Sequence, residues 1–263
     1  MQTNTPTLLA LDFDGVLCNG LVEYFQTAWR TYCHIWQPSE QTPNNDLVEK
    51  FYRLRPVIEI GWEMPVLIRA LILGIDEERI FHEWQTIAQE IITKENRDRA
   101  EIGSRLDRSR DEWIATDLEG WLSLHEFYPG VVEKVKQIIV SEVKPVIVTT
   151  KEGRFVRSLL QKQGINLPET DIIGKECKRP KYETLRMLLA ASGAGTIIWL
   201  VEDRLKTLLA VQKQPDLKEV ELFLADWGYN TTTERESVAQ HPPIQLLSKT
   251  QFCQDFSGWK TRF

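Results

Sequence analysis

The strongest constraint on the fold is a series of short apolar runs that end in polar side chains. The first run, Leu8-Leu9-Ala10-Leu11, is followed at once by Asp12, Phe13 and Asp14. Continuous apolar runs of this length are typical of strands that are buried on both faces, as in a parallel sheet. Three similar runs and one shorter run follow at residues 145–150, 196–203, 220–226 and 171–174. The sequence therefore predicts a sheet of buried strands with polar C-terminal ends.

Helical patterns separate the later runs. They span residues 131–140, 154–163, 181–191 and 205–212, and glycine or proline lies near most of their boundaries. Glycine after a helix and proline at its ends are common stop signals. Because strands alternate with helices, we predict an α/β fold built on a doubly wound parallel sheet.

One long segment breaks this alternation. Residues 19–127 have helical patterns and no convincing strand; the expected helices span 20–36, 44–54, 63–73, 77–97 and 110–122. A connection of this length needs structure of its own. We predict a core domain of residues 1–18 and 128–263 and a helical cap domain of residues 19–127. For residues 241–263, a terminal strand and helix or a simple covering of the core both stay open.

Composition excludes several classes of protein. The net charge is −6 and the isoelectric point about 5.4, which disfavours a nucleic-acid binder. No apolar run approaches the length of about 18 residues that a membrane span needs, and the first residues lack the basic region of a secretory signal. The four cysteines are scattered, as expected for free thiols in a reducing compartment. We expect a cytoplasmic protein, with monomer and homodimer both open.

The two aspartates after the first run predict a ligand site. Asp12 and Asp14 are two residues apart, so in an extended chain they share a face. In an open parallel sheet, ligands bind at the C-terminal ends of the strands. Two carboxylates this close resist ionising together unless a cation binds or one takes a proton. Gly15 then allows a sharp turn close to the ligand.

Other strand ends add complementary groups. Thr149 and Thr150 close the second long run, and Glu202 and Asp203 close the third. An oxygen-rich pocket of this kind suits Mg²⁺, which binds carboxylates together with the phosphate oxygens of a substrate. Basic residues just ahead of a predicted helix could neutralise that phosphate; they are Lys175, Lys178, Arg179 and Lys181.

Together these motifs resemble those of the haloacid dehalogenase-like superfamily of phosphohydrolases. Asp12-Phe13-Asp14-Gly15-Val16-Leu17 is similar to the first motif of that family, and Val146-Ile147-Val148-Thr149 to the second. A lysine before a helix is the third motif, and Leu200-Val201-Glu202-Asp203 resembles the fourth. The helical insert resembles the cap of phosphoglycolate phosphatase-like members. The segment Asp226-Trp227-Gly228-Tyr229, after the last predicted strand, resembles a segment that is common in those members.

The resemblance implies an Mg²⁺-dependent phosphatase that acts on a small phosphorylated metabolite. Asp12 would attack phosphorus and form an aspartyl-phosphate. Asp14 would protonate the leaving oxygen and then activate water. Thr149 and a lysine would contact the transferring phosphoryl group. Mg²⁺ would be held by Asp12, the backbone carbonyl of Asp14 and Asp203, with Glu202 as an inner- or outer-shell ligand.

The identity of the lysine stays open at this point. Lys178 has the better position relative to Pro180, and we favour it; Lys181 has the better spacing to the following helix. Thr150 is expected to contact substrate. Arg55, in a turn between two predicted cap helices, could also reach an anionic substrate, or it could form a surface ion pair.

Two other functions fit the same motifs. A sugar phosphomutase would share the first half of the reaction, and a non-catalytic phosphate-binding or regulatory protein could keep the fold. A dehalogenase protonates no leaving group, so the presence of Asp14 argues against it.

Overall fold

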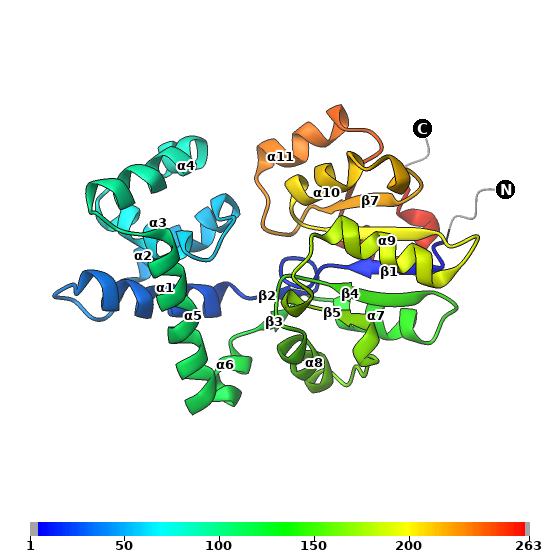
Figure 1. Cartoon of the computed structure of the whole chain (residues 1–263), viewed down its shortest axis with the longest axis horizontal. Helices are drawn as coiled ribbons and strands as arrows, with labels where there is room; N and C mark the ends of the chain where they lie inside the picture. Colours follow the sequence, from blue (N-terminus) through cyan, green and yellow to red (C-terminus); the bar gives the residue numbers. More distant parts are fainter. Residues whose placement is uncertain (1–4, 261–263) are drawn as a thin grey trace. The chain divides into compact units, whose positions relative to one another are not determined.

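A six-stranded parallel sheet forms the centre of the core unit (Figure 1). The structure is a computed structural model, and it describes residues 5–260. The strand order is β5-β4-β1-β6-β7-β8. Their bounds are β1 Leu8–Leu11, β4 Lys144–Val148, β5 Ile172–Ile173, β6 Ile198–Glu202, β7 Glu221–Ala225 and β8 Gln245–Leu247. The predicted doubly wound parallel sheet is confirmed.

The strand order reverses at β1. From β1 the chain passes outward to β4 and β5, then returns to the other side of β1 and continues through β6, β7 and β8. Leu11, the last residue of β1, lies opposite Ile147 of β4 and Val201 of β6. This register places Asp12 beside Glu202, at the end of the sheet where a reversal of strand order opens a crevice for ligands.

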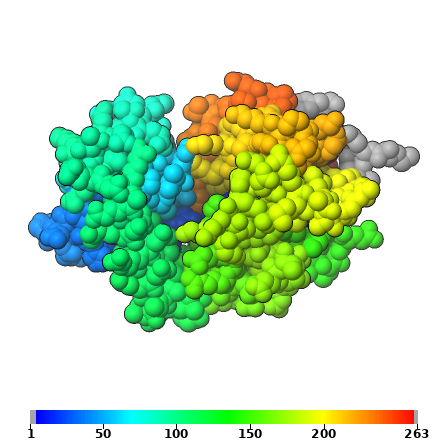
Figure 2. Space-filling model, in the orientation of Figure 1, coloured from blue at the N-terminus to red at the C-terminus, as the bar shows by residue number. Residues whose placement is uncertain are grey.

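Helices and the C-terminal segment cover the two faces of this sheet. The helices of this unit are α7 Val131–Ile139, α8 Gly153–Lys162, α9 Lys181–Ser192, α10 Leu205–Gln212, α11 Thr232–Ser237 and α12 Lys249–Phe252. Ala10 and Leu200 pack on one face with Leu185 of α9 and Leu208 of α10. In the space-filling view the yellow segment that includes α9 covers much of the visible face of this unit (Figure 2).

The opposite face is closed by aromatic side chains near the C-terminus. Trp199 of β6 and Phe223 of β7 lie 5.7 Å and 5.6 Å from Trp259, measured between ring centroids. Phe252 of α12 also packs on Trp259, at 5.2 Å. Of the two alternatives for residues 241–263, the structure therefore shows a terminal strand and helix. Residues 261–263 lie outside the described part.

The second unit, Gly20–His125, is helical, and the first comprises Met1–Asn19 and Glu126–Phe263. The helices of the second unit are α1 Leu21–Trp36, α2 Asn45–Leu54, the 3-10 helix η1 Arg55–Val57, α3 Glu63–Ile72, α4 Glu77–Lys94, α5 Arg99–Thr116 and α6 Leu118–Ser123. Side chains of the residues before four of them accept hydrogen bonds from first-turn amides; these residues are Asn44, Asp76, Asp98 and Asp117.

A buried ion pair ties this helical unit together. Glu23 of α1 is fully buried, and its carboxylate accepts hydrogen bonds from Arg110 Nε at 2.7 Å and Trp121 Nε1 at 3.1 Å. Thr27 Oγ1 also donates to it, at 2.7 Å. A buried carboxylate is stable only when it is paired and hydrogen-bonded in this way.

One predicted helix is wrong. The expected helix over 110–122 is two helices, because α5 already begins at Arg99 and the chain breaks at Asp117. Asp117 has φ −151° and ψ 69°, outside the helical region, and its side chain accepts from Gly120 N at 2.8 Å. The competing N-cap overrides the helical periodicity.

A two-stranded ribbon lies where the chain leaves and re-enters the core unit. β2 (Cys18–Asn19) pairs antiparallel with β3 (Glu126–Phe127). The two connections to the helical insert are therefore neighbours. Among helices in residues 5–260, none has the length and apolar character needed to cross a membrane.

Candidate active site

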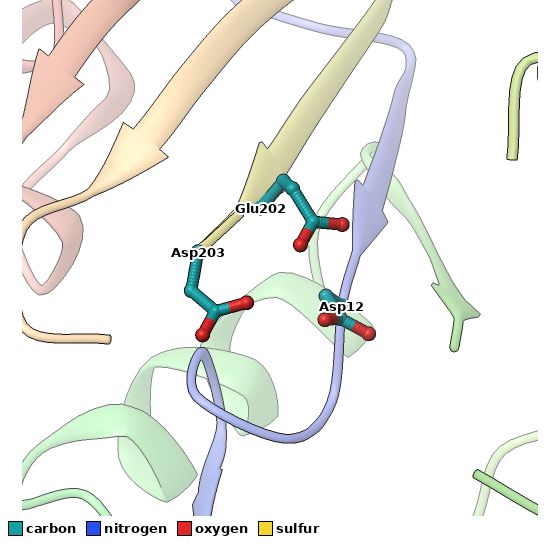
Figure 3. A group of neighbouring side chains, drawn as sticks. All are labelled: Asp12, Glu202 and Asp203. Atoms are coloured by element: carbon teal, nitrogen blue, oxygen red, sulfur yellow. The ribbon is translucent and has the colours of Figure 1, made fainter. Parts of the chain in front are cut away.

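Three buried carboxylates converge at the reversal point of the sheet. Asp12 follows β1, Glu202 ends β6 and Asp203 comes next (Figure 3). Each offers an oxygen atom, and these atoms lie within 4.8 Å of one another. The side chains come from neighbouring strands because the register pairs Leu11 with Val201. The strand ends that the sequence singled out therefore meet in space.

Lys181 lies among these carboxylates. Its Nζ is 2.8 Å from Asp12 Oδ1 and 2.6 Å from Glu202 Oε2, and its side chain is 10% exposed. The other oxygen of Glu202 accepts from the backbone N–H of Arg204 at 3.0 Å. Lys178, by contrast, is exposed and ends a short 3-10 helix in a left-handed conformation with φ 49°.

The structure brings Lys181 to the carboxylates, and not Lys178, which the sequence favoured. Pro180 is the residue before α9, so Lys181 is the first residue of the helix, and the helix starts at the sheet edge where the carboxylates lie. The distance in sequence from the proline was therefore a poor guide. The spacing to the helix, which favoured Lys181, agrees with this placement, and the catalytic role of either lysine stays a prediction.

The carboxylates destabilise one another's charged forms. Burial, with a further contribution from Glu202, raises the pKa of Asp12 to about 7, although Lys181 opposes the shift. Burial and the charge of Asp12 raise the pKa of Asp203 to about 6. Burial also raises the pKa of Glu202. For Lys181, burial disfavours the charge, but the two adjacent carboxylates outweigh it and raise the pKa.

Asp203 is held by two glycines and a backbone amide. A Cβ at Gly15, where φ is +88°, would overlap the Asp203 carboxylate, and a Cβ at Gly228 would overlap Asp203 Cβ. The backbone N–H of Tyr229 donates to Asp203 Oδ2 at 2.8 Å. Asn230 Nδ2 binds the Asp203 carbonyl oxygen at 2.9 Å. The segment after β7 therefore fixes the position of this carboxylate.

Asp14, after β1, and Thr149, after β4, are the remaining residues that the sequence predicts at the site. The structure places Lys151 Nζ 3.3 Å from Asp14 Oδ1. Thr149 is buried at the end of β4, and its Oγ1 accepts from the backbone N–H of Lys151 at 3.2 Å. Thr150 is exposed.

The carboxylate cluster fits a divalent cation. Asp12, Glu202 and Asp203 can contribute three negative charges, and Lys181 is the cation that forms ion pairs with two of them. Apart from the Lys181 ammonium at 2.8 Å, Asp12 Oδ1 has no hydrogen-bond partner among residues 5–260. Buried carboxylates that lack enough donors are stabilised by a hard cation such as Mg²⁺.

Arg55 belongs to the helical unit. Its Nη1 donates to the carbonyl oxygen of Ile58 at 3.1 Å, and its guanidinium lies 4.9 Å from the centre of the Tyr24 ring. These contacts hold the turn after α2. A role of Arg55 in substrate binding stays a prediction.

Two groups at the site were not expected from the sequence. Lys151 was not singled out, although it directly follows the pair Thr149-Thr150 at a strand end. The second is the backbone N–H of Tyr229, which donates a hydrogen bond to Asp203 and lies in the segment Asp226–Tyr229. Only the folded chain shows that this loop reaches Asp203.

Comparison with known proteins identifies the fold. By sequence, no family model and no curated protein matches the chain. By structure, it is similar to a haloacid dehalogenase-like family hydrolase from Streptococcus pneumoniae, with a TM-score of 0.56, 12% identity and coverage of 93% of this chain and 95% of the other. This chain has the haloacid dehalogenase-like fold.

The chain is also similar to two solved structures that are described as predicted phosphatases. One is described as a predicted phosphoglycolate phosphatase from Haemophilus somnus, with a TM-score of 0.60, 16% identity and coverage of 98% and 97%. The other is described as a predicted phosphatase from Clostridium acetobutylicum, with a TM-score of 0.56, 11% identity and coverage of 94% and 96%. At these identities the likeness concerns the fold.

Proposed function

We propose that the protein is an Mg²⁺-dependent phosphatase that hydrolyses a small phosphorylated metabolite through an aspartyl-phosphate on Asp12. The observation that supports this most directly is the Lys181 ammonium between Asp12 and Glu202, with Asp203 beside them. A cationic donor next to a buried carboxylate can stabilise charge that develops on a phosphoryl group. The names of the structural neighbours point to the same reaction class.

The reaction has two steps, the formation of the aspartyl-phosphate and its hydrolysis. In the first, an Asp12 oxygen bonds to phosphorus while the bond from phosphorus to the leaving oxygen breaks, and Asp14 gives that oxygen a proton. In the second, Asp14 takes a proton from water as the water oxygen bonds to phosphorus, and the bond to Asp12 breaks. Thr149 and Lys181 hold the phosphoryl oxygens throughout.

Asp12, Asp203 and the backbone carbonyl of Asp14 would hold the Mg²⁺. Glu202 has both oxygens engaged, by Lys181 and by the Arg204 amide, which favours an outer-shell role that positions Lys181. When bound, Mg²⁺ would offset the negative charge of the carboxylates and of the substrate phosphate. A cation would also favour the ionised form of Asp12, whose pKa is about 7 without one, and only the ionised form is a nucleophile.

We propose that Thr150 and Arg55 take part in substrate selection. Thr150 is exposed directly after Thr149 and can contact a bound ester. Because one neighbour is described as a predicted phosphoglycolate phosphatase, 2-phosphoglycolate belongs in any screen of phosphorylated metabolites. A cytoplasmic location stays a prediction.

The test is hydrolysis of p-nitrophenyl phosphate by the purified protein. Wild type with Mg²⁺ should release p-nitrophenol, and chelation of the metal should stop the release. Asp12→Asn should be inactive while melting as a folded protein, and Asp14→Asn should be slowed by about 10²-fold or more. No release from wild type with Mg²⁺, or activity retained by Asp12→Asn, would contradict the proposal.

A further inference from the structure

A lysine outside the expected motifs contacts the carboxylate that the proposed reaction uses for proton transfer. Lys151 Nζ lies 3.3 Å from Asp14 Oδ1, and the two side chains are only 9% and 17% exposed. An ion pair with this little solvent around it is weakly screened, so it restrains both partners more than a surface pair would. Among residues 5–260, Lys151 supplies the side-chain donor that contacts Asp14.

The backbone around Lys151 is held in place on both sides. Its N–H donates to Thr149 Oγ1 at 3.2 Å, and its carbonyl oxygen accepts from Lys175 N at 2.9 Å. Two residues later, Gly153 N donates to Glu176 Oε2 at 3.2 Å. The lysine therefore extends from a fixed point at the end of β4.

The backbone of Asp14 is fixed as well. The backbone of Asp14 forms an isolated β-bridge with that of Cys18. The next residue, Gly15, donates its N–H to the Cys18 carbonyl oxygen at 2.8 Å. With the backbone fixed, the remaining freedom of Asp14 is rotation about its two side-chain bonds, which sets the place and the orientation of the carboxyl group. The ammonium of Lys151 restrains this rotation by binding one oxygen, Oδ1.

We propose that Lys151 is a positioning residue that orients the Asp14 carboxyl group, so that Oδ2 is the oxygen that exchanges the proton. The inference rests on the proposed function. In the first step the proton passes from Asp14 Oδ2 to the leaving oxygen, and in the second it passes from water back to Oδ2. Lys151 keeps its own proton and donates to Oδ1 in both steps.

This role predicts a dependence on the leaving group. p-Nitrophenyl phosphate releases a weakly basic phenolate that needs little help from an acid, whereas phenyl phosphate releases a more basic one that needs a proton. Lys151→Met should therefore lower kcat/KM for phenyl phosphate about tenfold more than for p-nitrophenyl phosphate, since general acid catalysis contributes roughly 10²–10⁴-fold. Lys151→Arg should recover part of the loss.

A double-mutant cycle separates positioning from other roles. In an Asp14→Asn background, Lys151→Met should cause no further loss, because the group on which the lysine acts is already gone. Equal losses for the two substrates, or a further loss in that background, would overturn the inference and would indicate that Lys151 binds phosphate or supports the fold. Thermal melting of each variant checks that it is folded.

The two proposals fail in different ways. If wild type with Mg²⁺ hydrolyses neither ester, the proposed function fails and the role of Lys151 falls with it. If wild type is active and Lys151→Met shows no selective loss on phenyl phosphate, only the role of Lys151 is overturned.

Discussion

Removal of the Lys181 ammonium is the sharpest test of the site geometry. Lys181 Nζ lies 2.8 Å from Asp12 and 2.6 Å from Glu202, with 10% of its side chain exposed. Lys181→Met keeps most of the apolar volume and deletes the charge. Loss of one preorganised donor to a developing charge typically costs about 10²–10³ in kcat, or roughly 3–4 kcal/mol. We expect a loss of this size with p-nitrophenyl phosphate at saturating Mg²⁺.

Lys181→Met should also lower the free energy of unfolding of the metal-free protein. Breaking a buried ion pair by removing one partner costs roughly 3–5 kcal/mol. The loss should shrink at acidic pH, because Asp12, whose pKa is already about 7, becomes neutral and no longer needs a cation. Chemical denaturation in the presence of a chelator, at neutral and at acidic pH, measures both quantities.

Lys178→Met is the matched control. Lys178 is exposed, and surface substitutions usually change stability by less than about 0.5 kcal/mol. Its kcat and its free energy of unfolding should equal those of wild type. The reasoning would be refuted if Lys178→Met abolished turnover while Lys181→Met remained active.

Three further predictions follow from the carboxylate cluster and the helical unit. Without a divalent cation, the pKa values of Asp12 and Asp203 are raised, so between about pH 4 and pH 7 the folded state binds more protons than the unfolded state. The free energy of unfolding should therefore fall as the pH rises through that range. Mg²⁺ should reverse this trend, and melting curves with Mg²⁺ or with a chelator across the range test it. The methyl group of Gly228→Ala would overlap Asp203 Cβ, so this variant should bind Mg²⁺ about 10–100-fold more weakly, as measured by calorimetry. Gly103→Ala is the control: a Cβ there has no neighbour closer than 3.8 Å, and the Mg²⁺ affinity should be unchanged. Glu23→Gln should destabilise the protein by roughly 3–5 kcal/mol in denaturant titrations because it leaves a guanidinium without its buried counter-charge, and a loss below about 0.5 kcal/mol would contradict that view.

Much of the core could be predicted because its signals are local. A buried strand must be apolar along its whole length, so runs such as Leu8–Leu11 identify strands without knowledge of their partners. The parallel arrangement then brings their C-terminal ends to one edge. For this reason Asp12, Glu202 and Asp203 could be grouped before their distances were known.

Local competition explains the main error in the helical insert. The apolar pattern from 110 to 122 suggested one helix, but Asp117 caps a new helix by binding Gly120 N. An aspartate can serve as a helix residue or as an N-cap, and neighbouring packing decides between the two.

The sequence by itself determined which polar residues lie at the C-terminal ends of the strands, because each of them directly follows or ends a buried apolar run. These residues are Asp12, Asp14, Thr149, Glu202 and Asp203. Tertiary structure decided which charges neutralise these carboxylates. Lys181 rather than Lys178 meets Asp12, and Lys151 meets Asp14, because side-chain reach depends on where α9 and the end of β4 lie against β1. Asp203 likewise depends on Gly228 and Tyr229, a contact across 26 residues between Tyr229 N and the Asp203 carboxylate that no local pattern encodes.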